Sequence, residues 1–181
     1  MKAFLEFIEN CSPMKLKHFV LNWYSSGYWG DYTLNMQECL DAISPLLGRV
    51  EEEIFLYECN FDSSATFSQF MIASRKCRQV VVRSCVLNFE CTCNFGEDNI
   101  YCTEVLSLGH DKLKDRCGWH QNTNAFNSLC KGIQKSSLKA SLKEIVISEK
   151  SITLESAKQI LKTLGLENIA VSVGKTDPMV E

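Results

Sequence analysis

Apolar residues recur at positions i and i+2 along the chain, with an anchor three positions earlier and a small or polar residue three positions later. Alternate residues of a β-strand face the same side of a sheet, so each pair predicts a strand with one buried face. We find about six copies, not all of them complete. Their defining positions are Leu16, Phe19 and Leu21; Ile54, Leu56 and Cys59; Cys77, Val80, Val82 and Cys85; Leu106, Leu108 and Asp111; Leu142, Ile145 and Ile147; and Leu166, Ile169 and Val171.

The segments between these copies have apolar residues at helical spacing, which predicts that strand and helix alternate. Thr33, Ser64 and Thr153 precede three of these segments, where a side-chain oxygen can cap the backbone N–H groups at the start of a helix. The apolar helix positions are Met36, Cys39, Leu40, Ile43 and Leu47; Phe67, Phe70 and Met71; Phe126, Leu129, Cys130 and Ile133; and Leu154, Ala157, Ile160, Leu161 and Leu164.

The first residues form a separate pattern, because Phe4, Ile8 and Cys11 recur at helical spacing. This pattern predicts a capping helix over residues 1–12 at one end of a single domain that spans residues 1–181. About six repeat units occupy residues 14–173. Irregular insertions fall near residues 88–102 and 112–124, and residues 174–181 read as a tail.

The strand motif with its cysteine, and a period of roughly 26 residues around the second to fourth copies, resemble ribonuclease-inhibitor-type leucine-rich repeats. The resemblance covers most of the chain and is strongest in residues 77–87 and 141–173, although Thr103 replaces an apolar anchor. It implies a short curved α/β solenoid with a parallel sheet on the concave face and helices on the convex face. A doubly wound sheet is the alternative, but its strands would read as continuous apolar runs.

Residues between and after the core pairs should point out of the core and line the concave face. An apolar column flanked by aromatic and basic side chains has the composition of a binding hot spot. We therefore expect a non-catalytic scaffold or adaptor that binds a protein through Trp23, Phe55, Tyr57, Arg83 and His110. The alternative is an architectural subunit of a large assembly, docked by its uncapped C-terminal edge. The central column reads Val20, Phe55, Val81, Ser107, Val146 and Ala170.

Composition narrows the choice of partners. The chain has 181 residues, and its 19 basic and 22 acidic residues give a formal charge of −3, so nothing attracts nucleic acid or an anionic membrane overall. No apolar run approaches the roughly 20 residues that a membrane-spanning helix needs. The 10 cysteines without a signal peptide favour free thiols in a reducing, intracellular and cytoplasmic setting, with an organelle as the alternative.

Metal or redox chemistry is a third functional hypothesis. Cys91 and Cys93 lie near other thiols and imidazoles in the sequence and could contribute to a zinc site or a thiol sensor, but no Cys-x-x-Cys pair is present. The histidines fall in no nucleophile or metallohydrolase motif. We therefore expect no enzyme activity, no cofactor and no small-molecule substrate. The other candidate ligands are Cys85, Cys102, Cys117, His110 and His120.

Overall fold

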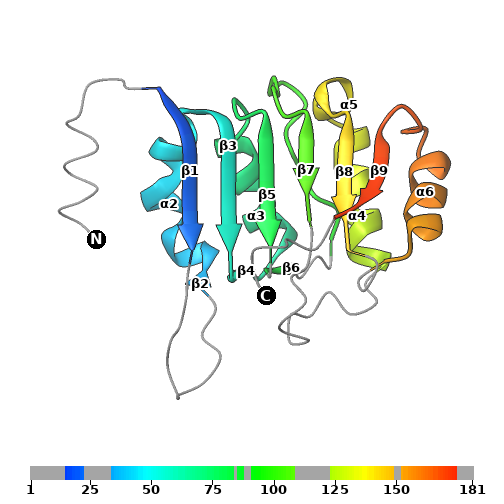
Figure 1. Ribbon diagram of the computed structural model, residues 1–181, viewed down its shortest axis with the longest axis horizontal. Helices are drawn as coiled ribbons and strands as arrows, with labels where there is room; N and C mark the ends of the chain where they lie inside the picture. Colours follow the sequence, from blue (N-terminus) through cyan, green and yellow to red (C-terminus); the bar gives the residue numbers. More distant parts are fainter. Residues whose placement is uncertain are drawn as a thin grey trace, which may run out of the picture.

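A computed structural model describes residues 15–22, 34–83, 85–87, 91–108, 123–148 and 152–174. Its architecture is α/β, with a parallel sheet and a layer of helices (Figure 1). The expected capping helix over residues 1–12 and all of the expected tail after Gly174 lie outside the described residues. So does the second expected insertion, except for residues 123 and 124, which begin a helix.

The large sheet has its strands in the same order as the chain, β1-β3-β5-β7-β8-β9, and every neighbouring pair is parallel. A doubly wound sheet reverses its strand order at a switch point, so this order excludes that alternative. The six strands are β1 (Leu16–Asn22), β3 (Val50–Tyr57), β5 (Gln79–Arg83), β7 (Val105–Ser107), β8 (Glu144–Ile147) and β9 (Ala170–Val173).

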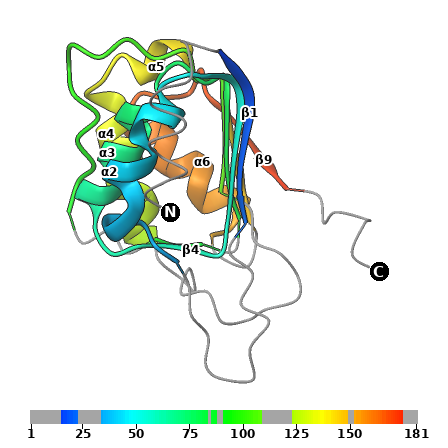
Figure 2. The same ribbon diagram turned by 90° about the vertical axis from the view of Figure 1, so that its left-hand side faces the viewer.

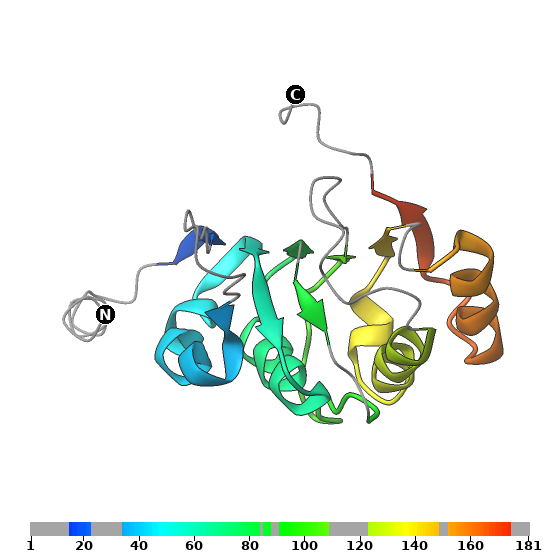
Figure 3. The same ribbon diagram turned by 90° about the horizontal axis from the view of Figure 1, so that it is seen from below.

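The helices lie along one face of this sheet (Figures 2 and 3). No described helix covers the opposite face, which we call the open face. The helices confirm the four helical segments that the sequence predicted between the strands. They are α2 (Met36–Leu47), α3 (Ser64–Ala73), α4 (Thr123–Gln134), α5 (Leu138–Ser141) and α6 (Leu154–Thr163).

Three of these helices begin at a side-chain cap. Thr153 caps α6 as expected, because its hydroxyl accepts a hydrogen bond from the N–H of Ser156 at 3.2 Å. Of the other two expected caps, Thr33 lies outside the described residues. The prediction that Ser64 caps α3 is wrong by one position. Ser63 caps α3, and Ser64 is already helical and buried. Asn35 caps α2, and asparagine is as favourable as serine at this position.

The core lies between the large sheet and the helices. The i and i+2 residues of the central strands point into it, as the sequence pattern predicted, and their exposed fractions are between 0% and 4%. Phe19 and Leu21 on the outer strand β1 are only half-buried. Burying a large aliphatic side chain contributes about 1.5–3 kcal/mol, so each of these pairs stabilises the fold substantially. They are Ile54 and Leu56, Val80 and Val82, Leu106 and Leu108, and Ile145 and Ile147.

The last strand departs from the expected register. Ile145 pairs with Val171 and Ile147 with Val173, so the strand is shifted by two residues from the expected pairing. Ile169 is nevertheless buried and Val171 packs against the core, as the sequence predicted. A shift of two residues keeps every side chain on its expected face, because strand side chains alternate. Ala170 is therefore opposite Glu144, and Ser172 takes the central place that the sequence reading gave to Ala170.

A second, smaller sheet was not anticipated from the sequence. Its parallel strands are β2 (Leu34–Asn35), β4 (Cys59–Phe61) and β6 (Val86–Leu87), and β4 runs from the large sheet towards the helices (Figure 2). Glu58 makes the corner between β3 and β4 with a φ of 57°. The left-handed corner redirects the chain, and Glu58 is only 6% exposed although it is charged.

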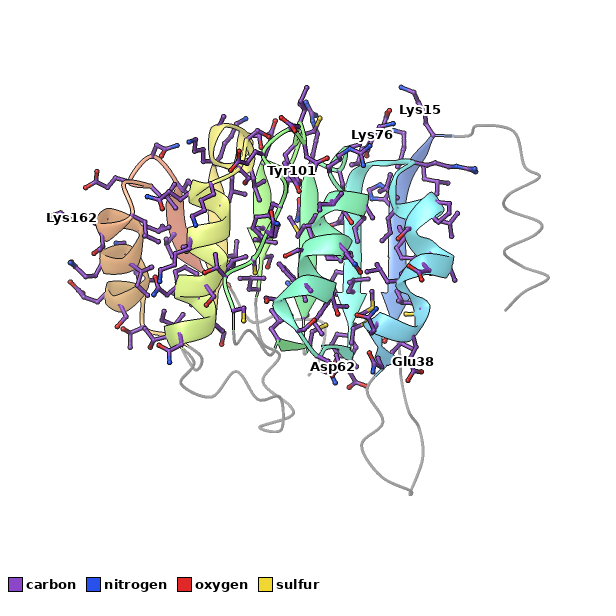
Figure 4. The ribbon with its side chains drawn as sticks, turned by 180° about the vertical axis from the view of Figure 1, so that it is seen from behind. Lys15, Glu38, Asp62, Lys76, Tyr101 and Lys162 are labelled. Carbon is purple, nitrogen blue, oxygen red and sulfur yellow. The ribbon has the colours of Figure 1, made fainter. Side chains whose placement is uncertain are left out.

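The expected insertion near residues 88–102 is partly a core element. From Cys91 the chain runs extended between α3 and α4 instead of forming a helix, and Tyr101 marks its far end (Figure 4). The N–H of Cys93 donates to the carbonyl of Ser128 in α4 at 3.2 Å, and the N–H of Asn94 donates to Ser68 Oγ in α3 at 2.9 Å. This extended segment therefore joins the two helices.

The contact between the extended segment and α4 predicts an unusual effect of one substitution. A Cβ atom at Gly132 would lie 2.6 Å from the carbonyl oxygen of Cys93, which is backbone and cannot rotate away. Glycine to alanine inside a helix normally stabilises by up to about 1 kcal/mol. Gly132→Ala should instead lower the free energy of unfolding by about 1–3 kcal/mol in denaturant titration.

Gly48→Ala is the matched control, since its Cβ would have no neighbour closer than 3.6 Å and its φ is −65°. It should leave the free energy of unfolding unchanged or slightly raised. Equal effects of the two substitutions would contradict the packing described for the extended segment.

Candidate functional site

One row of side chains crosses the open face from one edge of the large sheet to the other. Strand register places its members directly opposite one another on successive strands, with side chains directed away from the helices. It matches the central column expected from the sequence except at its last position. The open-face row is Val20, Phe55, Val81, Ser107, Val146 and Ser172.

The members of the open-face row differ in how much surface they offer. Val20 is 63% exposed, and Phe55 and Val146 are half-buried. Val81 and Ser107 are only 4% and 8% exposed, so the expectation that they present binding surface is wrong. Both are short and central, with strands on either side, and Val81 is opposite the larger Phe55. The accessible apolar groups of the row are therefore Val20, Phe55 and Val146.

Two residues predicted from the sequence, Tyr57 and Arg83, lie beside a third, Phe55, which belongs to this row. Tyr57 and Arg83 are directly opposite each other on β3 and β5, and Asn22 of β1 is opposite Tyr57. The guanidinium carbon of Arg83 lies 5.7 Å from the centroid of the Phe55 ring, which is a cation–π contact. Trp23 and His110, the other two predicted site residues, lie outside the described residues.

Charged side chains border the open face where strands β1 and β3 begin. Lys15 Nζ lies 2.8 Å from Glu51 Oε1, and Lys17 Nζ lies 3.1 Å from Glu52 Oε1. The His18 ring nitrogens lie 3.5 and 3.6 Å from carboxylate oxygens of Glu52 and Glu53. The acidic run of β3 is thus matched by basic groups on β1, which leaves this border without a strong net field.

A further ion pair lies just before the start of β7 and β8. Lys143 Nζ is 2.9 Å from Glu104 Oε2, and this hydrogen bond, together with the lysine charge, lowers the pKa of the Glu104 carboxyl. Both groups are exposed, so the pair contributes little to folding. Its effect is to reduce the charge presented at the beginning of these strands.

The cysteines proposed as metal ligands differ in how deeply they are buried. Cys91 and Cys102 are exposed, whereas Cys93 is buried, and burial raises the pKa of the Cys93 thiol to about 12. Within the described residues, no three His, Cys, Asp or Glu side chains are grouped as a metal ion would require. Cys117, His110 and His120 lie outside that part of the chain, so the complete proposed ligand set is not described.

In the part of the chain that the structure describes, no helix has the length and apolar character needed to cross a membrane. Comparisons with protein-family models, with curated proteins and with solved structures found no match to this chain. The functional argument therefore depends on the geometry of the open face.

The cysteine environments predict a clear order of chemical reactivity. Thiolates are the reactive form, and burial raises the pKa of Cys39 and Cys77 to about 11 and that of Cys93 to about 12. In a brief alkylation of the folded chain near about pH 8, peptide mass spectrometry should find Cys91 and Cys102 modified first. Denaturant should make the three buried thiols react at similar rates. Rapid modification of Cys93 in the folded chain would contradict its burial against α4.

Proposed function

We propose that this chain is a short leucine-rich-repeat solenoid of the ribonuclease-inhibitor type, and that its open face binds a protein partner without catalysing a reaction. Three features support the architecture: the strands follow chain order, all neighbouring strands are parallel, and the helices lie along one face. A repeat protein is built in this way because each strand–helix unit buries its apolar face only against its neighbours.

Hydrogen bonds between equivalent positions support the same proposal. The N–H of Cys59 donates to Cys85 Sγ at 3.3 Å, across a separation of 26 residues. These two cysteines occupy the same position in successive copies of the sequence motif. The Asn94 N–H to Ser68 Oγ bond also joins residues 26 apart. A contact that recurs at a fixed separation is what stacked repeats predict.

The observation that carries the binding proposal is the cluster of Phe55, Tyr57 and Arg83 beside the exposed Val20. Aromatic and arginine side chains dominate the energetics of protein interfaces, particularly where they surround an apolar centre. Arg83 already lies over the Phe55 ring, and all four residues are on paired strands. A rigid, pre-arranged surface loses less entropy when it binds than a flexible one.

The chemistry of this cluster favours recognition over catalysis. Its groups are an aliphatic side chain, a phenyl ring, a phenol and a guanidinium, which suit contact with apolar and hydrogen-bonding side chains of a protein. A paired general acid and base is absent from these four residues. We infer a non-catalytic scaffold or adaptor, and the reducing setting expected from the sequence makes an intracellular protein its partner.

A double substitution tests the open face. Arg83→Glu combined with Tyr57→Ala should weaken partner binding by about 100-fold or more, because both groups adjoin the centre of the proposed interface. The full chain first serves as bait, and a purified partner that it retains is then titrated against each variant. The matched control is Glu155→Lys, a charge reversal at an exposed position on α6.

Thermal unfolding must show that both variants remain folded. Binding that survives the double substitution, or is weakened equally by Glu155→Lys, would place the interface elsewhere on the molecule.

A further inference from the structure

The outer edge of β9 offers unpaired backbone groups. Ala170 N–H donates to the carbonyl of Lys143 at 2.8 Å, and Gly174 N–H donates to that of Ile147 at 2.9 Å. Backbone groups alternate in direction along a parallel strand, so the N–H and C=O groups of Val171 and Val173 point away from β8. No described strand pairs with them. Such an edge is able to hydrogen-bond an added strand.

A groove adjoins this edge on the helix side. It lies between α6 and β9 and has a volume of about 330 Å³. Val171 is the partly exposed apolar residue of its lining, and Leu161 and Ile169 are buried beneath it, at 2% and 3% exposure. Ile160 and Leu164 nearby are only half-buried. α6 is the outermost helix at this end of the molecule (Figures 1 and 3). The last strand–helix unit therefore leaves part of its apolar side accessible among the described residues.

The charges on the groove indicate what kind of segment it would accept. Lys158 and Lys162 line it, both are exposed, and neither forms an ion pair within the described part of the chain. Figure 4 shows Lys162 on the outer side of α6. Glu167 is the one acidic residue among the groove's lining residues. The groove therefore favours an occupant with carboxylates beside an apolar stripe.

We propose that the outer edge of β9 binds an extended acidic segment of another protein, which adds a strand to the large sheet. Its backbone would hydrogen-bond to Val171 and Val173, as in other cases of strand addition. Every second side chain of the added strand would face α6. At these positions, apolar side chains would cover Val171, and carboxylates would meet Lys158 and Lys162.

A second copy of this chain fits the edge less well. A second copy could offer either edge of its own sheet, β1 or β9, and neither strand contains an acidic residue. Lys15 and Lys17 would instead bring further positive charge to a basic groove. Strand addition at β9 is also separate from binding at the open face, since the two surfaces share no residue named in either proposal.

The probe is a short, fluorescently labelled peptide of the repeat Val-Thr-Glu-Thr, in which valines and glutamates share one face of a strand. It is titrated against the full chain and followed by fluorescence anisotropy. The same peptide with lysine in place of glutamate is the comparison. The glutamate peptide should bind at least about tenfold more tightly, and Lys158→Glu with Lys162→Glu should reverse this preference. Equal binding of the two peptides, or no binding of the glutamate peptide, would overturn the proposal.

A second pair of variants tests the backbone contact. Val173→Pro removes an outward N–H but spares the bonds to β8, whereas Val173→Ala keeps that N–H. The proline variant should lose at least about tenfold in affinity for the glutamate peptide relative to the alanine variant. If Val173→Pro fails to fold, a peptide N-methylated at alternate residues tests the same bonds on the unaltered chain. Undiminished binding in either test would rule out strand addition.

Discussion

The fold depends on one continuous apolar layer between the large sheet and the helices. Each central strand supplies two fully or almost fully buried side chains to it, such as Ile54 and Leu56 from β3 and Val80 and Val82 from β5. Because strand side chains alternate, a register slip by one residue would exchange this layer with the open face. The same constraint that holds the core together therefore fixes which side chains a partner can meet.

The elements with strong periodicity were predictable from the sequence, and the departures have local causes. Alternation in β3 and β5 and helical spacing in α2, α3, α4 and α6 identified these elements. The extended segment after Cys91 was not recognised as core, because its alternation is short and interrupted. Its buried residues form two separate pairs, Cys93 with Phe95 and Tyr101 with Thr103, with a turn at residues 97–98 between them. The corner at Glu58 was not predicted, because a left-handed backbone at a non-glycine residue has no clear sequence signal.

The face of the sheet that carries the candidate site was predictable from the sequence, but the exposure of each side chain on that face was not. Period-two alternation placed Phe55, Tyr57 and Arg83 on the open face, and strand register brings them together. The same pattern could not predict the burial of Val81 and Ser107, which depends on the size of side chains on adjacent strands. Nor could it predict the groove beside β9, which arises where the last strand–helix unit lacks a described neighbour. The two proposed contact regions therefore lie on different parts of the large sheet: its open face and the outer edge of β9.

Methyl NMR of valine-labelled chain, with and without the bound partner, tests the central claim most directly. Val80 and Val82 point into the core, whereas Val20 and Val146 are accessible on the open face. Partner binding should shift the methyl signals of Val20 and Val146 strongly and leave those of Val80 and Val82 almost unchanged. Shifts confined to core valines, or an unchanged Val20 signal at saturation, would contradict recognition through the open face.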